Sequence, residues 1–358
     1  MLNRESDRTA GRRAGNQSLA TVAWVKRRSP TASVVYDTYW NFAVKRQEIL
    51  FRRVYREEAP WTTDPILSQY KFTNAYRAVD RVSQYLIRSV IHAGSYGAAD
   101  TVFRVLLFKL FNKIDTWELL KRSHGEMAAD NFDVKQFDRT LTAATDSGAA
   151  IYSGAYIMPS GPASIRQPKK HRMHLELLAS LMRENLTERL LAARTMEEAY
   201  RVLLSIPGIG PFLAYQYVTD LNYSDHFNFS EMEFVVPGPG ARDGIKKCFS
   251  DLGDYSEADA IRWVAERQTE EFASRGLIFP SLWGRPLQLI DCQNLFCEVD
   301  KYARVMHPDV SGLSGRTRIK QKFSANLTPF RPWFPPKWKI NDRIGELEQR
   351  VEAVLPMD

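Results

Sequence analysis

The segment Ile206-Pro207-Gly208-Ile209-Gly210 has the residue types of a tight hairpin that binds phosphate. Its glycines allow close backbone approach and positive φ, and Pro211 suits the first turn of a following helix. The amide groups exposed at a helix start attract anions, because their N–H groups and the helix dipole both favour negative charge. We therefore expect Gly208, Ile209 and Gly210 to bind phosphate groups; the alternative is a helix-helix turn without function.

A second glycine-rich turn, Gly238-Pro239-Gly240, also precedes a predicted helix. Gly240 at its end and the cations Arg242 and Lys246 on that helix make it a candidate for a second phosphate site. An ordinary loop leading into a helix is the competing interpretation.

Three polar side chains recur at steps of three in one predicted helix: Asn74, Arg77 and Asp80. An amide, a guanidinium and a carboxylate together can read the polar edge of a nucleobase. The alternative is an exposed ion pair between Arg77 and Asp80.

Three further residues join these as candidates for a base pocket: Trp61, Asp64 and Glu298. Trp61, in the turn before that helix, either stacks on a base or fastens the turn to the core, and Asp64 lies in the same turn. Glu298 shares a helix face with Lys301, so a surface ion pair is the alternative for this carboxylate.

Two basic segments flank a nearly neutral body. Residues 1–30 hold seven Arg or Lys and two acids, and we expect a disordered tail that either binds phosphate or only aids solubility. No acid occurs between Asp309 and Asp342, where Lys320 and six other cations alternate with aromatic rings. That pattern is typical of a nucleic-acid surface, although a proline-rich strap packed on the body would also produce it.

Apolar periodicity predicts helices that carry these residues. We expect helices over 36–56, 65–91, 102–111, 171–185, 196–205, 211–221 and 287–304, and another from Arg242. The fold class is all-α or nearly so. We divide the chain into a tail at 1–30, a helical domain at 31–310 with a lid-like loop at 145–168, and an extension at 311–358.

Composition excludes several classes of protein. The three cysteines lack metal-ligand spacing, so we expect no metal, no iron-sulfur cluster and no other cofactor. No apolar run is long enough to span a membrane, and the start of the chain lacks a signal peptide. We expect a cytoplasmic monomer.

The hairpin and the helix after it resemble the helix-hairpin-helix DNA glycosylase superfamily. That resemblance implies a catalytic carboxylate about twenty residues after the hairpin, where this chain has Glu231 and Glu233. A carboxylate there would stabilise the positive charge that develops on the sugar as an N-glycosidic bond breaks. Pro211 stands where bifunctional members have a lysine, which implies a monofunctional enzyme.

A closer resemblance covers roughly residues 36–304 and depends on several segments together. The chain is similar there to the family called the hydroxymethyluracil DNA kinase helical domain, or α-glutamyl/putrescinyl thymine pyrophosphorylase. The segments that carry it are Pro60-Trp61-Thr62-Thr63-Asp64-Pro65-Ile66-Leu67, residues 70–81, Gly238-Pro239-Gly240-Ala241 and residues 293–302. The resemblance implies action on a 5-substituted pyrimidine in DNA.

Three functions are compatible with these features. We expect a DNA glycosylase that flips a hypermodified pyrimidine out of double-stranded phage DNA and excises it in anti-phage defence. The alternatives are a transferase that displaces phosphate or pyrophosphate from an activated 5-hydroxymethyl group, and a noncatalytic DNA-binding protein. No GxxxxGK[ST] motif occurs in the 358 residues, so the resemblance does not bring a P-loop kinase with it.

Overall fold

The computed structural model describes residues 27–154, 159 and 167–345, and this part of the chain is mostly helical. The predicted fold class is therefore confirmed. The helices span Val34–Val54 (α1), Pro65–Gln69 (α2), Arg81–Tyr85 (α3), Ala98–Phe111 (α4), Ile114–His124 (α5), Val134–Asp146 (α6), Lys170–Arg183 (α7), Leu186–Leu191 (α8), Met196–Leu204 (α9), Pro211–Leu221 (α10), Pro239–Cys248 (α11), Glu257–Ser274 (α12) and Leu289–Met306 (α13).

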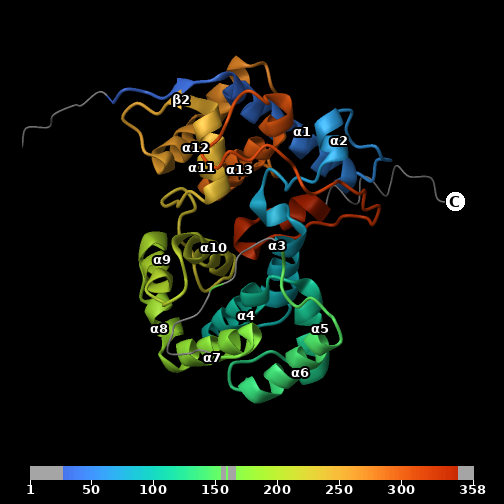
Figure 1. Cartoon of the computed structure of the whole chain (residues 1–358), viewed down its shortest axis with the longest axis vertical. Helices are drawn as coiled ribbons and strands as arrows, with labels where there is room; N and C mark the ends of the chain where they lie inside the picture. Colours follow the sequence, from blue (N-terminus) through green and yellow to red (C-terminus); the bar gives the residue numbers. More distant parts are fainter. Residues whose placement is uncertain (1–26, 155–158, 160–166, 346–358) are drawn as a thin grey trace, which may run out of the picture.

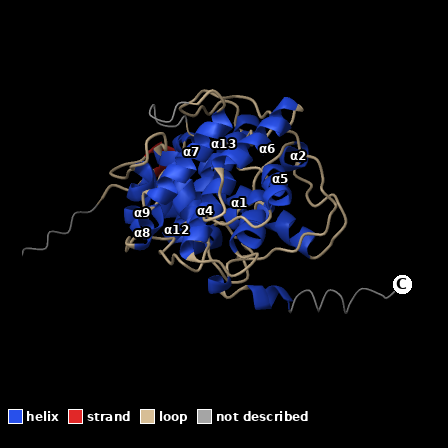
Figure 2. Cartoon of the chain, turned by 90° about the horizontal axis from the view of Figure 1, so that it is seen from below, coloured by secondary structure: helices blue, strands red, loops and turns tan. Residues whose placement is uncertain are grey.

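Short turns and one small sheet complete the described elements. Arg77–Val79 (η1) and Pro336–Trp338 (η4) are 3-10 turns, and Leu86–Ile91 (η2) is a π-helical turn. Strands Thr31–Ala32 (β1) and Phe249–Asp251 (β2) pair antiparallel, with Thr31 opposite Asp251 and an irregular register. Figure 2 shows how little strand the ribbon contains.

The helices pack in two groups, which form the two lobes seen in Figure 1. The first lobe contains α1, α2, α11, α12 and α13, so its helices come from both ends of the described chain. The second lobe contains α4 to α10, which are inserted between α2 and α11 in the sequence. The chain therefore crosses between the lobes twice, near η1 and again after α10.

Polar caps fix the starts of several helices. The side chain of Ser33 accepts a hydrogen bond from the Val35 amide at the start of α1, and Thr195 accepts one from Glu198 at the start of α9. Helix α12 starts with a reciprocal capping box between Ser256 and Asp259. Such caps satisfy amide groups that have no partner within the helix.

Helices α11 and α13 cross closely because one glycine allows it. A Cβ atom added at Gly244 would lie 1.9 Å from the carbonyl oxygen of Phe296. Aromatic rings from α1, including Tyr39 and Trp40, fill the core beside this crossing, and the ring of Tyr39 lies 4.6 Å from that of Phe296. The first lobe is thus built around α13.

The predicted helix over 65–91 is wrong, because the structure breaks it into α2, η1, α3 and η2. Residues 71–76 are not helical, and two of their amides bond to side chains instead: Thr73 donates to Glu298 at 2.9 Å and Asn74 donates to Asp80 at 2.9 Å. Side-chain acceptors of this kind compete with the backbone ladder of a helix. As a result, Asn74, Arg77 and Asp80 do not share one helix face.

Other expectations fall partly outside the described residues. Of the basic tail, residues 1–26 lie outside them, whereas Arg27 and Arg28 form ion pairs with Asp259 and Asp251. Of the lid-like loop, residues 155–158 and 160–166 lie outside them. Within the described ranges, no helix has the length and apolar character needed to cross a membrane.

Candidate functional site

The hairpin between α9 and α10 has buried anchors and an exposed tip. Ile206 and Ile209 are 3% and 5% exposed, whereas Gly208 and Gly210 face solvent. Gly208 has a φ of 90°, which favours glycine, and Gly210 caps α10 with Pro211 at its first position. Within the described part of the chain, the amides of Gly208 and Gly210 donate to no acceptor. The tip therefore presents donors that an anion can bind.

The turn at Gly238 and Gly240 is enclosed. A Cβ atom at Gly240 would lie 2.3 Å from Sγ of Cys297, and one at Gly238 would lie 2.9 Å from the ring of Phe212. Close packing against α13 and α10 therefore accounts for both glycines. On the following helix, Arg242 pairs with Glu257 at 2.8 Å. Lys246 is exposed.

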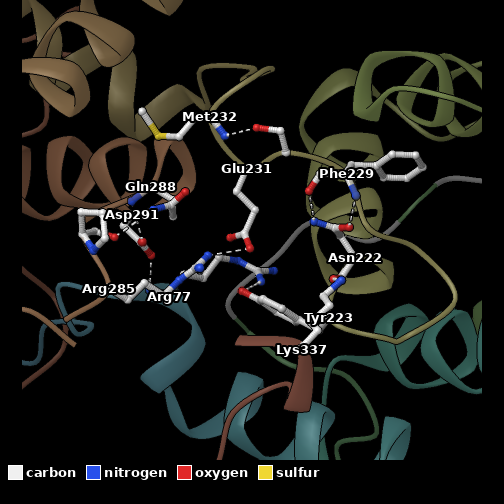
Figure 3. A network of polar contacts seen from close by, with 12 residues as sticks. Arg77, Asn222, Tyr223, Phe229, Glu231, Met232, Arg285, Gln288, Asp291 and Lys337 are labelled. Atoms are coloured by element: carbon white, nitrogen blue, oxygen red, sulfur yellow. Dashed lines mark hydrogen bonds and ion pairs between the residues drawn. The ribbon is translucent and has the colours of Figure 1, made fainter. Parts of the chain in front are cut away.

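A cluster of charged side chains lies at the junction of the two lobes. This junction cluster consists of Arg77, Asp220, Tyr223, Glu231, Arg285 and Asp291. Figure 3 shows Arg77, Glu231 and Arg285 meeting from separate segments, with Tyr223 on one side and Asp291 on the other.

Arg77 links the lobes through both its side chain and its backbone. Its guanidinium contacts Asp220 of α10 at 2.7 Å and donates to the Tyr223 hydroxyl at 3.0 Å. Its backbone amide donates to Asp291 of α13 at 2.8 Å. Asp220 also pairs with Lys109 of α4 at 3.2 Å, and both are buried. This half of the cluster is sealed, so Arg77 holds the lobes together and is not free to read a base.

Glu231 and Arg285 form the accessible half of the cluster. They pair at 2.6 Å, and their side chains are 11% and 18% exposed. The Nε atom of Arg285 has no hydrogen-bond partner among the described residues. Because an unsatisfied guanidinium donor is costly to bury, this Nε–H is a donor that a water molecule or a ligand can satisfy.

Asp291 sits beside this pair at the start of α13. It accepts hydrogen bonds from the backbone amides of Gln288 and Arg77, which favour its charged form. Burial, helped by the nearby charge of Glu231, nevertheless raises the pKa of Asp291 to about 7. The two carboxylates therefore differ in environment although they lie in one cluster.

Glu233, the other predicted catalytic acid, lies outside the cluster. Its side chain is exposed, and its backbone carbonyl accepts a hydrogen bond from Arg262. Of these two glutamates, Glu231 alone has a side-chain partner among the described residues.

Asn74, Asp80 and Glu298 lie in a separate cluster around Arg46. The Arg46 guanidinium donates to the Thr73 carbonyl and to the Asn74 side chain, which in turn donates to Asp80 at 3.1 Å. Burial, with the charge of Glu298 beside it, raises the pKa of Asp80 to about 6. Glu298 pairs with Lys301 at 2.6 Å, as its alternative interpretation predicted, but it is buried and does not lie on the surface.

Trp61 and Asp64 have structural contacts. Trp61 is buried, and its indole N–H donates to the carbonyl of Glu57 at 2.8 Å, so its ring fastens the turn to the core. Asp64 caps α2 and accepts hydrogen bonds from Lys45 and Tyr302. Burial opposes its ionisation, but these hydrogen bonds outweigh that effect and lower the pKa of Asp64.

The basic aromatic segment divides into two parts. Residues 316–329 are mostly exposed, Lys320 among them, and Lys322 stacks on the Tyr70 ring at 4.2 Å. Farther on, Phe334 is fully buried and Trp338 stacks on Arg285. The packed-strap interpretation therefore describes the second part, whereas nucleic-acid binding by the exposed first part stays a prediction.

Two cavities occur in the described structure, one far from the junction cluster and one lined in part by Gly284 and Pro286, the two neighbours of Arg285. One of about 520 Å³ is lined by residues that include Tyr152, Lys169 and His171, and one of about 290 Å³ lies beside Phe272 and Phe279. Among the described residues, no three His, Cys, Asp or Glu side chains lie close enough to hold a metal ion.

Sequence reasoning missed Arg285, Asp291 and Lys337. Each comes from a segment far from the hairpin. Arg285 and Asp291 reach the junction cluster only through the tertiary fold, and Lys337 reaches in the same way the turn after α10, where it bonds to the Asn222 carbonyl. Asp291 had one local signal, because Gln288 and Asp291 have the spacing of a capping box, which the structure contains.

Comparison with known proteins identifies a phage relative. The chain is 28% identical over 300 residues to the 5-hmdU DNA kinase of Bacillus phage SP10. The match covers 77% of this chain and 46% of the relative, so the chain spans about half the length of that relative. No solved structure matches the chain.

This relative overturns the expected chemistry. A DNA kinase is a transferase, so the prediction of a monofunctional glycosylase that flips out and hydrolytically excises a base in defence is wrong. The error came from the hairpin, whose likeness to glycosylases concerns backbone contacts and says nothing of which bond breaks.

The family itself follows from a match over most of the chain. The model described as "5-hmdU DNA kinase, helical domain" matches residues 33–312, a range that includes both glycine turns and all of the junction cluster. It also includes every segment on which the closer resemblance depended. The chain therefore belongs to the family of 5-hmdU DNA kinase helical domains.

Proposed function

We propose that this chain binds DNA and recognises 5-hydroxymethyluracil for a transferase that acts on the 5-hydroxymethyl group. The observation that carries the proposal is the Glu231–Arg285 pair, which is largely buried and whose Arg285 Nε has no partner among the described residues. Membership of the kinase family and the name of the phage relative support the choice of substrate.

The pair has the chemistry that separates this base from thymine. The two bases differ by one hydroxyl, which projects into the major groove next to the O4 acceptor. The Glu231 carboxylate can accept a hydrogen bond from that hydroxyl, while the Arg285 Nε–H donates to O4. A site built around such a hydrogen bond discriminates strongly against a base that lacks the hydroxyl.

The same carboxylate suits transfer to the hydroxymethyl oxygen. When that oxygen bonds to phosphorus and the donor's phosphate bond breaks, the hydroxyl proton must go to a base, and Glu231 would receive it. The 358 residues contain no GxxxxGK[ST] segment to hold a nucleotide. In this proposal the chain therefore binds the DNA substrate and does not hold the nucleotide.

The hairpin supplies binding that does not depend on the base. Its exposed amides and the start of α10 would hold a phosphate, with Lys320 as a second phosphate contact. In this proposal the hairpin and Lys320 provide affinity for the DNA backbone, and the Glu231–Arg285 pair provides selectivity for the base.

Competition binding with two duplexes that differ only at one thymine tests the proposal. The parent protein should prefer the 5-hydroxymethyluracil duplex by roughly tenfold or more, because a lost hydrogen bond to a charged group has that cost. Glu231→Ala, which removes the acceptor, should lose the preference, while the matched control Glu233→Ala should keep it. Equal affinity of the parent for both duplexes would refute base recognition.

Mass spectrometry of the duplex distinguishes the reactions. After incubation with a phosphoryl donor and a P-loop kinase partner, the proposal predicts a phosphate ester on the hydroxymethyl group. Free base in the supernatant would contradict a transferase.

A further inference from the structure

The matched family segment ends at residue 312, but the chain continues into the site. Residues 332–341, here called the strap, pass beside α10 and the turn after it (Figure 1). Trp333 exchanges two hydrogen bonds with the Gln84 side chain, and Phe334 exchanges two with that of Asn341. Phe334 is fully buried, so the strap is an integral part of the fold.

Lys337 of the strap fixes the turn that carries Glu231. Its ammonium donates to the carbonyls of Asn222 and Phe227 and, at 3.1 Å, to that of Ser224. Within the same turn, Asn222 exchanges two side-chain hydrogen bonds with the Phe229 backbone. Three carbonyls in the turn after α10 thus converge on one cation, and the dipole of α10 favours a positive charge at its end. Figure 3 shows Lys337 beside Asn222, the first of these residues.

Trp338, the next residue, holds Arg285 from the other side. The Arg285 guanidinium lies 3.8 Å from the centroid of the indole ring, and Glu231 bonds its Nη2 at 2.6 Å. The Trp338 ring also contacts that of Tyr223, at 5.8 Å. Arg285 is thus held between a ring and a carboxylate, in a position that leaves its Nε without a partner in the described chain.

We propose that Lys337 and Trp338 are positioning residues for the Glu231–Arg285 pair, so that the strap completes the base-reading site from outside the matched family segment. Lys337 sets the path of the turn and hence the place of the Glu231 carboxylate. Trp338 sets the plane of the Arg285 guanidinium. This inference rests on the proposed function, since it assigns that site's selectivity to these two residues.

The charge of Lys337 makes the positioning sensitive to pH. Its charged neighbours are Glu231, Asp225 and Arg285, and Asp225 also faces His92 at 3.8 Å. Burial lowers the pKa of Lys337 to about 8. Above that pH the amine loses its charge and one of three donors, so the turn is held less firmly and selectivity falls.

The experiment measures the ratio of affinities for the 5-hydroxymethyluracil and thymine duplexes at about pH 7 and about pH 9, a range in which unshifted lysines and arginines stay charged. The parent ratio should fall with rising pH. Lys337→Arg should keep a high ratio at both pH values, because its guanidinium stays charged. Lys337→Met should give a low ratio at both, while Lys339→Met, which changes the exposed neighbouring cation, should behave as the parent.

Trp338 gives an independent test. Trp338→Leu removes the ring beneath Arg285 and should lower the ratio roughly tenfold, whereas Trp338→Phe should restore part of it. Thermal unfolding identifies any variant that fails to fold.

The outcomes separate the two proposals. A parent protein without preference for either duplex overturns the proposed function. A parent with a preference that is constant between the two pH values, or that survives both Lys337→Met and Trp338→Leu, overturns the positioning role and leaves the proposed function intact.

Discussion

The two glycine turns of this chain look alike in sequence and differ in surroundings. Gly210 and Gly238 both cap a helix that has proline at its first position. A Cβ atom at Gly210 would have nothing within 4 Å, whereas one at Gly240 would overlap Cys297. The first turn exposes its amides, and the second uses its glycines to bring helices together.

The difference shows that a glycine-proline sequence predicts the shape of a turn but not whether the turn binds a ligand. Glycine and proline specify the backbone path into a helix, and both turns follow such a path. Whether the amides bind a ligand depends on what the rest of the fold places over them. The turn at Gly210 is a candidate for anion binding because it is exposed, whereas the turn at Gly240 is covered by packed side chains.

The largest expected effect is on stability at the enclosed turn. Gly240→Ala should lower the free energy of unfolding by about 1–3 kcal/mol, because its Cβ overlaps Sγ of Cys297. Chemical denaturation measures this change.

A second substitution checks the cause. Cys297→Ala removes the overlapping sulfur, so adding Gly240→Ala to that variant should cost much less than it costs in the parent. The matched change Gly210→Ala should shift stability by no more than about 0.5 kcal/mol, since its Cβ enters open space. Equal costs at the two turns would break the comparison.

The next effect is on DNA affinity at the exposed turn. Gly210→Val places a branched side chain beside the amide donors and should weaken binding roughly tenfold without changing the melting temperature. Gly208 suits this test less well, because its φ of 90° would add backbone strain. Fluorescence anisotropy measures the affinity.

Gly97 provides the control for that measurement. It caps α4 and also has open space around its Cβ, so Gly97→Val makes the same change at another helix start. Similar losses in both variants would show that the hairpin has no special part in binding.

The smallest effect concerns a cation away from both turns. Lys320→Ala should weaken binding of modified and unmodified duplexes alike and reduce the slope of log affinity against log salt by about one. Arg201→Ala, which removes a cation already paired with Glu197, should leave the slope unchanged. A change in base preference after Lys320→Ala would mean that this residue does more than contact phosphate.

Much of the helical fold was predictable from local pattern. The prediction for residues 211–221 coincides with α10, and those for 196–205 and 171–185 differ from α9 and α7 by no more than two residues at either end. The continuous helix over 65–91 failed because the partners that break it, such as Glu298, lie more than two hundred residues away. Periodicity carries no information about such partners.

The site was predictable only in part, for the same physical reason. Spacing from the hairpin selected Glu231, but it selected the exposed Glu233 equally. Arg77 was selected for base reading, yet its guanidinium is occupied by Asp220. Arg285 and Lys337 acquire their roles from neighbours on other segments, so no local motif marks them.

The double crossing between the lobes has a consequence for how the chain folds. Helix α1 packs against α11 and α13, so it lacks its partners until nearly all of the described chain has been made. The inserted helices find their partners among one another and can collapse earlier. The hydrogen bond from the Arg77 amide to Asp291 then forms only as α13 docks, so the junction cluster is complete only at a late step of assembly.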